Sequence, residues 1–558
     1  MKFNDRKIII VLVFVIFIAV FLRFYNLGEI PPGLTNDEAN IGYDAYSILK
    51  TGKDQWGNFL PLTAFKGFGD FRPPLYTYLT VPSIAIFGLN EFAVRFPSAI
   101  VGVLTVIAAF FLGKKLFRNT IIGILSALIL ALNPWHIGMS RVGIESNLSV
   151  FLVTLGVLFF LKGKGNPKLF FLSLLFFTLS LYAYTANLLF TPFIFLSLIL
   201  IYRPLGQKSK KTFFAAVILA IIMLLPFFLN SPQGTGKTRF GQVNLGKNIG
   251  LVNTINEKRG ECQKDWNATF CRITFNKGVA FSFNFLGNYA QHFSPELLLT
   301  NGTITQLSVL PPRGLLFHFE FFLLPLGIWF LLKRKDSPAL LLLAWLFLAP
   351  VADSLTGNGH YSRAFVFLPS LQIVSAYGLY QTVRLIKFRK IYLSLIALLI
   401  LFEISTFIPE YFSYYPRFFS RNSHYGYKEL VSYLEDVKDN YDQIVVSSRY
   451  NDTKQYAFFL FFTAYDPVKF QTSREIAKSW EEDGWLRVEK IDNWYFAPSL
   501  PSGDEFKQSE QKILLVGAAE EFPPKITVRR EIDDLKGDPL FKAVDIQDLL
   551  NYDAESKR

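Results

Sequence analysis

Three carboxylates and three arginines in this sequence have the side chains needed to move a group from a phosphate to a hydroxyl. The carboxylates are Asp37, Glu38 and Glu145, and the arginines are Arg72, Arg141 and Arg363. A positioned carboxylate can take the proton of an attacking hydroxyl, and arginines can stabilise the charge that develops on a leaving phosphate. This chemistry requires the two kinds of side chain to meet in one place, which the surrounding segments must arrange.

The acidic pair lies at the start of a predicted helix. Thr35 and Glu38 have the spacing of a capping box, and Gly52 marks the end of the helix. Glu38 therefore has a structural interpretation as a cap beside its interpretation as a catalytic group. Asp37 would favour the positive end of the helix, and we take it as the candidate base.

Arg72 comes directly before two prolines, which restrict its backbone to extended or turn conformations. The apolar run 75–87 that follows is too short to cross a bilayer comfortably, and its tyrosines, including Tyr76, are typical of a membrane interface. Arg72 is thus expected at the level of the lipid headgroups. There it would either bind a phosphate or merely extend its charged head to the interface from an apolar stem.

A second pair, Arg141 and Glu145, is spaced by four residues. On one helix the two side chains would share a face and could simply pair. Charged groups beside a membrane are costly unless they have partners, which favours a function for them. The predicted outward turn 353–363 adds His360 and Arg363. We expect these groups to converge at one face of the bilayer and to bind the phosphate of a lipid carrier.

The composition is that of a membrane protein. Hydrophobic residues make up 51% of the 558 residues and charged residues only 18%, below the share of about 25% found in soluble proteins. Apolar stretches that could cross a hydrocarbon core lie at 7–25, 94–117, 119–138, 146–162, 168–185, 187–203, 212–229, 315–332, 338–353, 364–383 and 391–409. The predicted fold is a polytopic α-helical bundle of about eleven transmembrane helices.

The basic loops orient this bundle. Lys and Arg residues precede the first stretch and then occupy every second connection. By the positive-inside rule, those connections and the N-terminus are cytoplasmic in a protein of the cell membrane. The outward segments are then 26–93, 133–145, 230–314, 353–363 and the chain after about 410. All long segments lie outside, so we expect no cytoplasmic domain for ATP or a nucleotide sugar.

Two domains are expected. Residues 1–412 form the transmembrane domain, with its outward loops 26–93 and 230–314. Residues 425–558 change to a mixture of helical periodicity and strand-like runs, the last of these at 512–516 and 526–528. This pattern indicates a small extracytoplasmic α/β domain.

The net charge of +13 does not indicate a nucleic-acid partner, because the cations cluster in short membrane loops. The two cysteines, Cys262 and Cys271, lie in an outward loop, where a structural disulfide is permitted. The five histidines have no ligand spacing. The sequence therefore predicts no metal site and no other cofactor, and it leaves a divalent cation open.

Several phrases together resemble a known family. They are an Arg-Phe-x-x-Leu phrase at the end of the first span, Asp37-Glu38, Arg72-Pro73-Pro74-Leu75-Tyr76 and Glu91-Phe92-Ala93-Val94-Arg95-Phe96-Pro97-Ser98. Over roughly residues 20–150 the chain resembles the GT-C glycosyltransferases, and more narrowly the protein O-mannosyltransferase and lipid A aminoarabinose transferase group. The other spans match that group only in architecture.

The resemblance implies an enzyme that transfers a sugar, with inversion, from a polyprenyl-phosphate carrier. The acceptor would be a hydroxyl or other nucleophile of a lipid, glycan or protein on the outer face of the membrane. By position, Asp37 matches the catalytic aspartate of the family and Glu38 its acidic neighbour. Arg72 stands where many members have lysine, and Glu145 stands where many have aspartate.

The resemblance and the residue types together suggest which other residues bind the donor phosphate and which support the site. The donor phosphate would bind to the three arginines, Arg72, Arg141 and Arg363. Supporting roles fall to Glu145, Tyr76 and His360. The family offers no motif for the tail after residue 410, so the tail's function stays open.

Two other classes of protein remain as alternatives. A transporter or lipid flippase for cell-envelope glycoconjugates would place ionisable residues near the middle of the bilayer and often contains inverted repeats. The charges of this chain lie at the ends of its spans instead. A non-catalytic receptor would use the tail to bind a partner.

Overall fold

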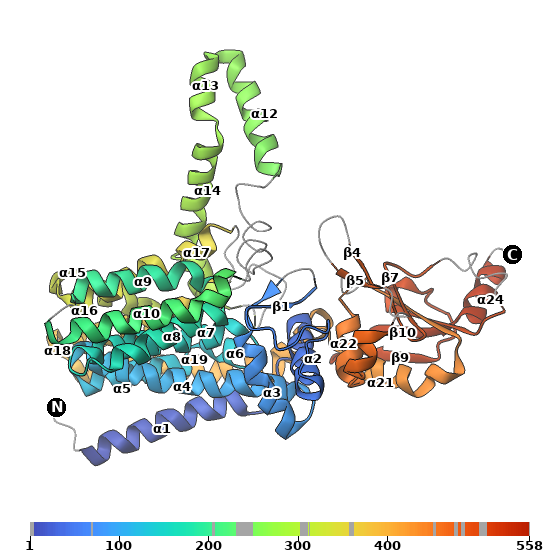
Figure 1. Cartoon of the computed structure of the whole chain (residues 1–558), viewed down its shortest axis with the longest axis horizontal. Helices are drawn as coiled ribbons and strands as arrows, with labels where there is room; N and C mark the ends of the chain where they lie inside the picture. Colours follow the sequence, from blue (N-terminus) through green and yellow to red (C-terminus); the bar gives the residue numbers. More distant parts are fainter. Residues whose placement is uncertain are drawn as a thin grey trace.

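The computed structural model describes residues 5–68, 71–203, 207–229, 249–301, 311, 313–356, 362–449, 454–473, 478–480, 486–501 and 510–556. A helical bundle occupies one end of the molecule and a small sheet domain the other (Figure 1). The segments that carry Asp37 and Arg72 lie between these two parts.

Helices are present at every stretch that we expected to cross the membrane. They are α1 (Asp5–Phe24), α4 (Glu91–Phe117), α5 (Thr120–Leu132), α6 (Pro134–Ser140), α7 (Glu145–Gly163), α8 (Leu169–Ala183), α9 (Asn187–Tyr202), α10 (Gln207–Leu229), α15 (His318–Arg334), α16 (Ser337–Leu348), α18 (Ser370–Leu385) and α19 (Arg389–Pro409). By length and composition, six helical stretches within the described residues can cross a membrane, or seven if the bent pair α5–α6 counts as one. The chain is therefore a polytopic integral membrane protein.

The stretch 119–138 is not the single straight helix that the sequence predicted. Helices α5 and α6 meet at 63°, because Pro134 cannot donate the hydrogen bond that would continue α5. Asn133 caps the new helix by accepting from the His136 N–H. The stretch 338–353 is also divided, since α16 is followed by the short helix α17 (Val351–Ser354).

Small residues bring the bundle helices together. A Cβ added at Gly378 of α18 would lie 2.6 Å from the Leu323 carbonyl oxygen of α15. A Cβ at Gly327 of α15 would likewise lie 2.2 Å from the Val374 carbonyl oxygen of α18. Such close approach of backbones is how helices associate in lipid, where burial of apolar area gives little advantage. Large apolar side chains point outward instead, as Phe17 of α1 does with 65% exposure.

The first connecting segment folds as its local signals indicate. Helix α2 (Asn36–Thr51) has the predicted capping box at its start and Gly52, in the left-handed conformation, at its end. Helix α3 (Leu75–Phe87) coincides with the short apolar run. Between them, β1 (Phe65–Lys66) and β2 (Phe71–Arg72) pair in antiparallel fashion, which brings Arg72 back towards α2.

The C-terminal part is a mixed sheet with helices around it. The sheet order is β6 (Lys490–Ile491), β7 (Trp494–Ala497), β3 (Gln443–Ser447), β8 (Ile513–Ala518), β10 (Pro539–Asp545) and β9 (Arg530–Asp533). Strand β3 is parallel to β7 and β8, and the other neighbours are antiparallel. The helices are α21 (Tyr427–Val437), α22 (Tyr456–Phe462), α23 (Pro467–Thr472) and α24 (Ile546–Ser556), and β4 (Lys478–Trp480) pairs separately with β5 (Leu486–Val488).

One strand of this domain was predicted in the wrong place. Residues 526–528 are not a strand, although Ile526 and Val528 pack into the apolar cluster on one side of the sheet. The preceding Pro523 and Pro524 cannot donate ladder hydrogen bonds. Pairing begins only where the Arg529 N–H donates to the Ala543 carbonyl oxygen at 2.7 Å.

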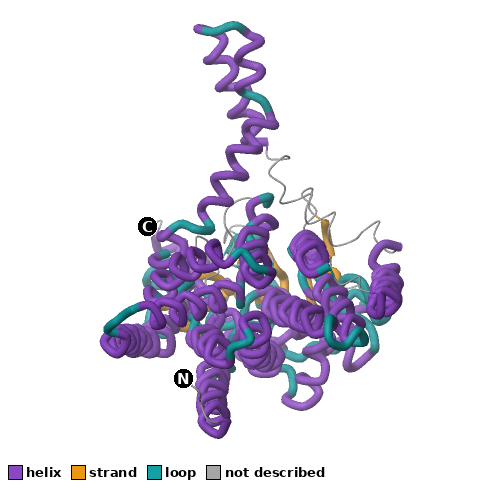
Figure 2. Tube along the Cα trace, turned by 90° about the vertical axis from the view of Figure 1, so that its left-hand side faces the viewer, coloured by secondary structure: helices purple, strands orange, loops and turns teal. Residues whose placement is uncertain are grey.

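A helical hairpin projects from the bundle between α10 and α15 (Figures 1 and 2). It consists of α12 (Ile249–Asp265), α13 (Ala268–Thr274) and α14 (Lys277–Gln291). A disulfide joins Cys262 to Cys271, with the Cα atoms 5.8 Å apart. We call residues 249–291 the lateral hairpin.

Candidate active site

Glu38 fixes the start of α2 to the bundle. Its carboxylate accepts from the Thr35 N–H at 2.9 Å and from the Gly143 N–H at 2.9 Å. It also forms an ion pair with Arg95 of α4, Nε to Oε1 at 2.8 Å, in which both side chains are only 1% exposed. A Cβ at Gly143 would meet the Glu38 Cγ at 3.2 Å, so this approach depends on glycine. The contacts of Glu38 are those of a cap and a cross-link.

Arg95 extends this cross-link to the segment that follows α1. Beyond Glu38, its guanidinium donates to the carbonyl oxygens of Leu27 and Pro31, at 3.1 and 2.9 Å, and to that of Gly33. Sequence reasoning quoted Arg95 within a family phrase but gave it no role. Its position beside the long apolar run of α4 was the available signal, because an arginine at the edge of a membrane-spanning stretch needs partners.

Asp37 and Arg72 meet directly. The Arg72 guanidinium lies 2.6 Å from the Asp37 carboxylate and also donates to the Asp37 carbonyl oxygen at 3.1 Å. The Asp37 side chain is 61% exposed, whereas that of Arg72 is 8% exposed and stacks on the Phe68 ring at 5.3 Å. An accessible carboxylate is thus held by a buried cation at the start of a rigid helix.

Two further polar residues share the Asp37 side of α2. Asn40 and Asp44 follow at intervals of three and four residues, which places all three on one face. The buried Asp44 carboxylate accepts from the backbone and side-chain N–H groups of Gln55. Burial and the nearby Asp54 raise the pKa of the Asp44 carboxyl well above its usual range, against the influence of Arg72.

Asn40 is 1% exposed, and its amide nitrogen and oxygen have no hydrogen-bond partner among the residues that the structure describes. Buried amides are nearly always paired, so such an exception calls for water or a ligand as partner. Sequence reasoning missed Asn40 and Asp44. Their spacing from Asp37 along a helix was the signal that could have found them.

Tyr76 and Glu145 connect this helix to the bundle. The Tyr76 hydroxyl donates to the Val94 carbonyl oxygen at 2.8 Å and lies within electrostatic range of Glu38 and Glu145. Glu145, 9% exposed, begins α7 and also interacts with the Tyr184 hydroxyl. Glu145 therefore lies between the α2 segment and the end of α8, where Tyr184 is located.

Arg141 does not pair with Glu145 as one helix would have allowed. It lies at the end of α6, and Glu145 begins α7. Its guanidinium donates to the carbonyl oxygens of Leu22, Tyr25 and Ile30, at 3.0, 2.6 and 2.9 Å, and faces the Phe412 ring at 5.0 Å. These contacts join the end of α1 to the chain after α19, which is a structural role.

Arg363 belongs to a second polar cluster. Its guanidinium donates to the Thr356 hydroxyl at 2.8 Å and lies 3.7 Å from the Asp353 carboxylate. Asp353 is paired with His292, Nε2 to Oδ2 at 2.8 Å, and both of these side chains are buried. The Arg363 side chain is 22% exposed. His360 lies outside the described residues.

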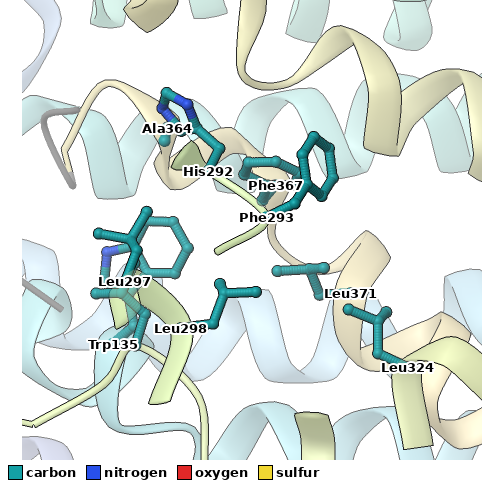
Figure 3. Close-up of a pocket in the computed structure, with 10 residues that line it drawn as sticks. Trp135, His292, Phe293, Leu297, Leu298, Leu324, Ala364, Phe367 and Leu371 are labelled. Atoms are coloured by element: carbon teal, nitrogen blue, oxygen red, sulfur yellow. The ribbon is translucent and has the colours of Figure 1, made fainter. Parts of the chain in front are cut away.

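A small apolar cavity of about 20 Å³ adjoins this cluster. His292 stands at its wall, and Trp135, Leu297, Leu298 and Leu371 surround it (Figure 3). A cation and a buried His–Asp pair thus lie next to an apolar space. This combination suits a molecule that has an anionic head and a hydrocarbon tail.

The C-terminal part also reaches the α2 segment, which the sequence did not predict. The His424 Nδ1–H donates to the Leu34 carbonyl oxygen at 3.3 Å, and His424 lies within electrostatic range of Asp37, Glu38 and Lys454. Tyr43 of α2 donates to the Tyr465 carbonyl oxygen at 3.1 Å. The sheet domain is therefore packed on the helix that carries Asp37.

The His424 environment predicts an acid-sensitive fold. Burial lowers the pKa of His424 to about 4, from an unfolded value near 6.5. Between these two pH values the unfolded chain binds more protons than the folded chain. The contribution of His424 to the free energy of unfolding is therefore fully present above about pH 6.5 and is lost as the pH falls towards 4.

The variant His424→Asn removes the titrating ring, and asparagine tolerates the φ of 57° at this position. Between pH 7.5 and 5, we expect the Tm of the wild type to fall roughly 5 °C more than that of this variant. Equal falls would exclude His424 as the source.

No group of three or more His, Cys, Asp or Glu side chains within the described residues is arranged to hold a metal ion.

The fold resembles that of the polytopic membrane glycosyltransferases of GT-C type. The family model described as dolichyl-phosphate-mannose-protein mannosyltransferase matches residues 71–229, and this segment of the chain is similar to that family of glycosyltransferases. A putative mannosyltransferase of Bacillus subtilis (strain 168), YkcB, is 24% identical over 235 residues, which are 42% of this chain and 31% of that protein. An uncharacterised protein of Aquifex aeolicus (strain VF5) is 28% identical over 172 residues. The matched segments span about a third of the length of these two relatives.

Solved structures agree on the fold. ArnT from Cupriavidus metallidurans, bound to undecaprenyl phosphate, is similar with a TM-score of 0.53 and 11% identity, over 95% of this chain and 97% of that one. The archaeal oligosaccharyltransferase AglB from Archaeoglobus fulgidus, in complex with an inhibitory peptide and a dolichol-phosphate, is similar with a TM-score of 0.52 and 15% identity, over 83% and 64% of the two chains. The predicted architecture is therefore correct at the level of the GT-C fold.

Proposed function

We propose that this protein is an inverting glycosyltransferase that moves a sugar from a polyprenyl-phosphate carrier to a nucleophile at the outer face of the membrane. The observation that carries the proposal is the accessible Asp37 carboxylate, held 2.6 Å from the buried Arg72 at the start of α2. A base for the acceptor and a cation for the leaving phosphate are thus adjacent. The acceptor would be a hydroxyl or other nucleophile of a lipid, glycan or protein.

In the proposed reaction, Asp37 takes the proton of the acceptor as its nucleophile attacks the anomeric carbon. The bond from this carbon to the phosphate oxygen breaks, and the leaving group is the lipid phosphate. Arg72 and Arg363 stabilise the charge on that phosphate. Arg72 would exchange part of its contact with Asp37 for the phosphate when the donor binds.

The apolar cavity beside His292 and Arg363 supports a lipid-linked donor. The first isoprene units of the carrier would pack against the apolar side chains around this cavity, while Arg363 contacts the phosphate. Such a donor already contains an activated sugar, so the reaction needs no nucleotide.

A polar cleft supports a separate route for the acceptor. The cleft, of about 540 Å³, lies between the first connecting segment and α21, and His424 forms part of its wall. Since His424 is also within electrostatic range of Asp37, an acceptor in this cleft would approach the proposed base from the sheet-domain side.

The remaining assignments belong to the same proposal. The N-terminus is cytoplasmic, and eleven helical spans make up a transmembrane domain of residues 1–412. Residues 425–558 form an extracytoplasmic domain. Glu145, Tyr76 and His360 support the site, whereas Glu38 and Arg141 act by holding the segments that carry it.

Purified protein incubated with a series of polyprenyl-phosphate sugars and candidate acceptors tests this function. We expect sugar transfer with inversion at the anomeric carbon and release of the lipid phosphate. Donor transport without any transferred product would support the transporter alternative instead.

Arg72→Ala is expected to lower the rate of transfer by roughly 10²–10³-fold, the usual effect of losing one group that stabilises developing charge. Arg72→Lys should recover part of this loss, because the charge remains but the two-point contact with Asp37 does not. Single-turnover measurements with saturating donor isolate this step. Lys512→Ala, an exposed cation of the sheet domain, is the matched control. An Arg72→Ala variant as fast as this control would exclude Arg72 from the site.

A further inference from the structure

The lateral hairpin extends away from the bundle in a direction that crosses the bundle helices. In Figure 1 the helices of the bundle run horizontally and the hairpin rises upward from them. In Figure 2, turned by a quarter, the hairpin still points outward from the side of the bundle. Because the spans run across the bilayer, a segment that crosses their direction runs along the plane of the membrane.

The root of the hairpin is attached to the bundle near the end of α16. The Tyr289 hydroxyl donates to the Phe347 carbonyl oxygen at 2.8 Å, and the Asn288 amide donates to the Ser354 carbonyl oxygen at 3.4 Å. His292, directly after the hairpin, pairs with Asp353. Phe347 itself is 53% exposed, so the hairpin begins on a lipid-facing side of the bundle.

Beyond this root, the hairpin displays large apolar side chains. None of the residues of α14 is buried, and the exposed fractions of Phe283 and Leu286 are 72% and 60%. At the tip, Trp266 and Ile273 are 64% and 66% exposed. A lone helix of this length is marginal in water, and exposed apolar surface of this kind marks a contact with another phase or molecule.

The charges of the hairpin favour a lipid surface. It contains five cationic and three acidic side chains, and α14 has Lys277 as its one charged residue. Exposed apolar side chains, such as Phe283 and Leu286, together with a basic excess are features of helices that lie in the headgroup region of a bilayer. The direction of the hairpin and its attachment on a lipid-facing side of the bundle also favour a lipid bilayer as the partner of this surface.

We propose that the lateral hairpin lies in the outer interface of the bilayer as an arm, with Trp266, Phe283 and Leu286 inserted among the lipid chains. The Cys262–Cys271 disulfide holds the tip closed, which keeps its aromatic residues together, since Trp266 and Phe270 pack with ring centroids 5.3 Å apart. This role does not depend on the proposed sugar transfer.

Site-specific fluorescence on the full chain tests the arm. Both cysteines are in the disulfide, so a cysteine introduced by Phe283→Cys is the one thiol that reacts with an environment-sensitive fluorophore. The labelled protein is reconstituted in phospholipid nanodiscs that contain a lipid with a nitroxide high on its acyl chain. Asn440→Cys, on an exposed turn of the sheet domain, is the matched control.

The nitroxide lipid is expected to quench the label at position 283 at least threefold more than the label at position 440, and aqueous iodide is expected to show the opposite order. Leu286→Cys gives an independent reading should Phe283→Cys disturb the helix. Strong iodide quenching at both hairpin positions would place them in water and overturn the proposal. Protection from both quenchers would mean that a second copy or another protein covers the face, which also overturns it.

Discussion

Sugar transfer by the Asp37→Asn variant is expected to be about 10²–10⁴-fold slower than that of the wild type, the range attributed to a general base. The substitution keeps the shape of the side chain, and the amide oxygen can still accept from Arg72. It removes the capacity to take a proton from the acceptor. The loss should therefore appear in kcat, with little change in the KM for the donor.

Matched measurements separate this loss from damage to the fold. The Asp37 side chain is 61% exposed, so its substitution should leave the thermal unfolding temperature close to that of the wild type. Asp439→Asn, an exposed carboxylate in the sheet domain, should retain full transfer. Undiminished transfer by Asp37→Asn, measured alongside this control, would remove Asp37 as the base.

The second large effect is expected on stability, at the buried pair of Glu38 and Arg95. Removing one partner leaves the other charge buried in the protein, which costs about 3–5 kcal/mol. Glu38→Gln should therefore lower the free energy of unfolding by an amount in this range. Thermal and denaturant unfolding of the protein in detergent measure it. Glu261→Gln, which removes one member of a pair that is 67% exposed on both sides, should cost less than about 1 kcal/mol.

A double-mutant cycle with Arg95→Met tests whether the two residues act together. Strong coupling is expected, because the loss from either single substitution contains the penalty for the unpaired partner. Independent, additive losses would contradict the cross-link. These measurements also distinguish the roles of Glu38 and Asp37. Glu38→Gln should reduce the amount of folded enzyme, whereas Asp37→Asn should reduce the rate of transfer per folded molecule.

Much of the fold could be predicted because its signals are local. A span is a continuous apolar run, and every predicted run coincides with a helix. The capping box and Gly52 mark the ends of α2 within one or two residues, and the run 75–87 became α3. The strand expected at 526–528 was wrong, since a strand exists only where a neighbour pairs with it, and apolar residues in a loop give the same pattern.

The candidate site was predictable in its residue types and not in its contacts. Glu38 had a structural and a catalytic interpretation in the sequence, and the partner that distinguishes them is Arg95, 57 residues later. Arg141 was grouped with Arg72 by charge alone. Its contacts with backbone carbonyls could not be inferred, because carbonyl groups are present at every residue and leave no pattern in a sequence.

By itself, then, the sequence determined that the chain is a membrane protein that resembles the GT-C glycosyltransferases, with an acidic pair and an arginine in its first long connecting segment. Apolar runs, helix caps and prolines are local signals, because each acts on residues that are neighbours in the sequence. They therefore predict helices and their ends directly from the order of the residues. The tertiary structure decided that Arg72 lies against Asp37, that Glu38 is a cross-link and that the sheet domain packs on α2. These contacts join residues that are distant in sequence, and only the packing of the folded chain selects them.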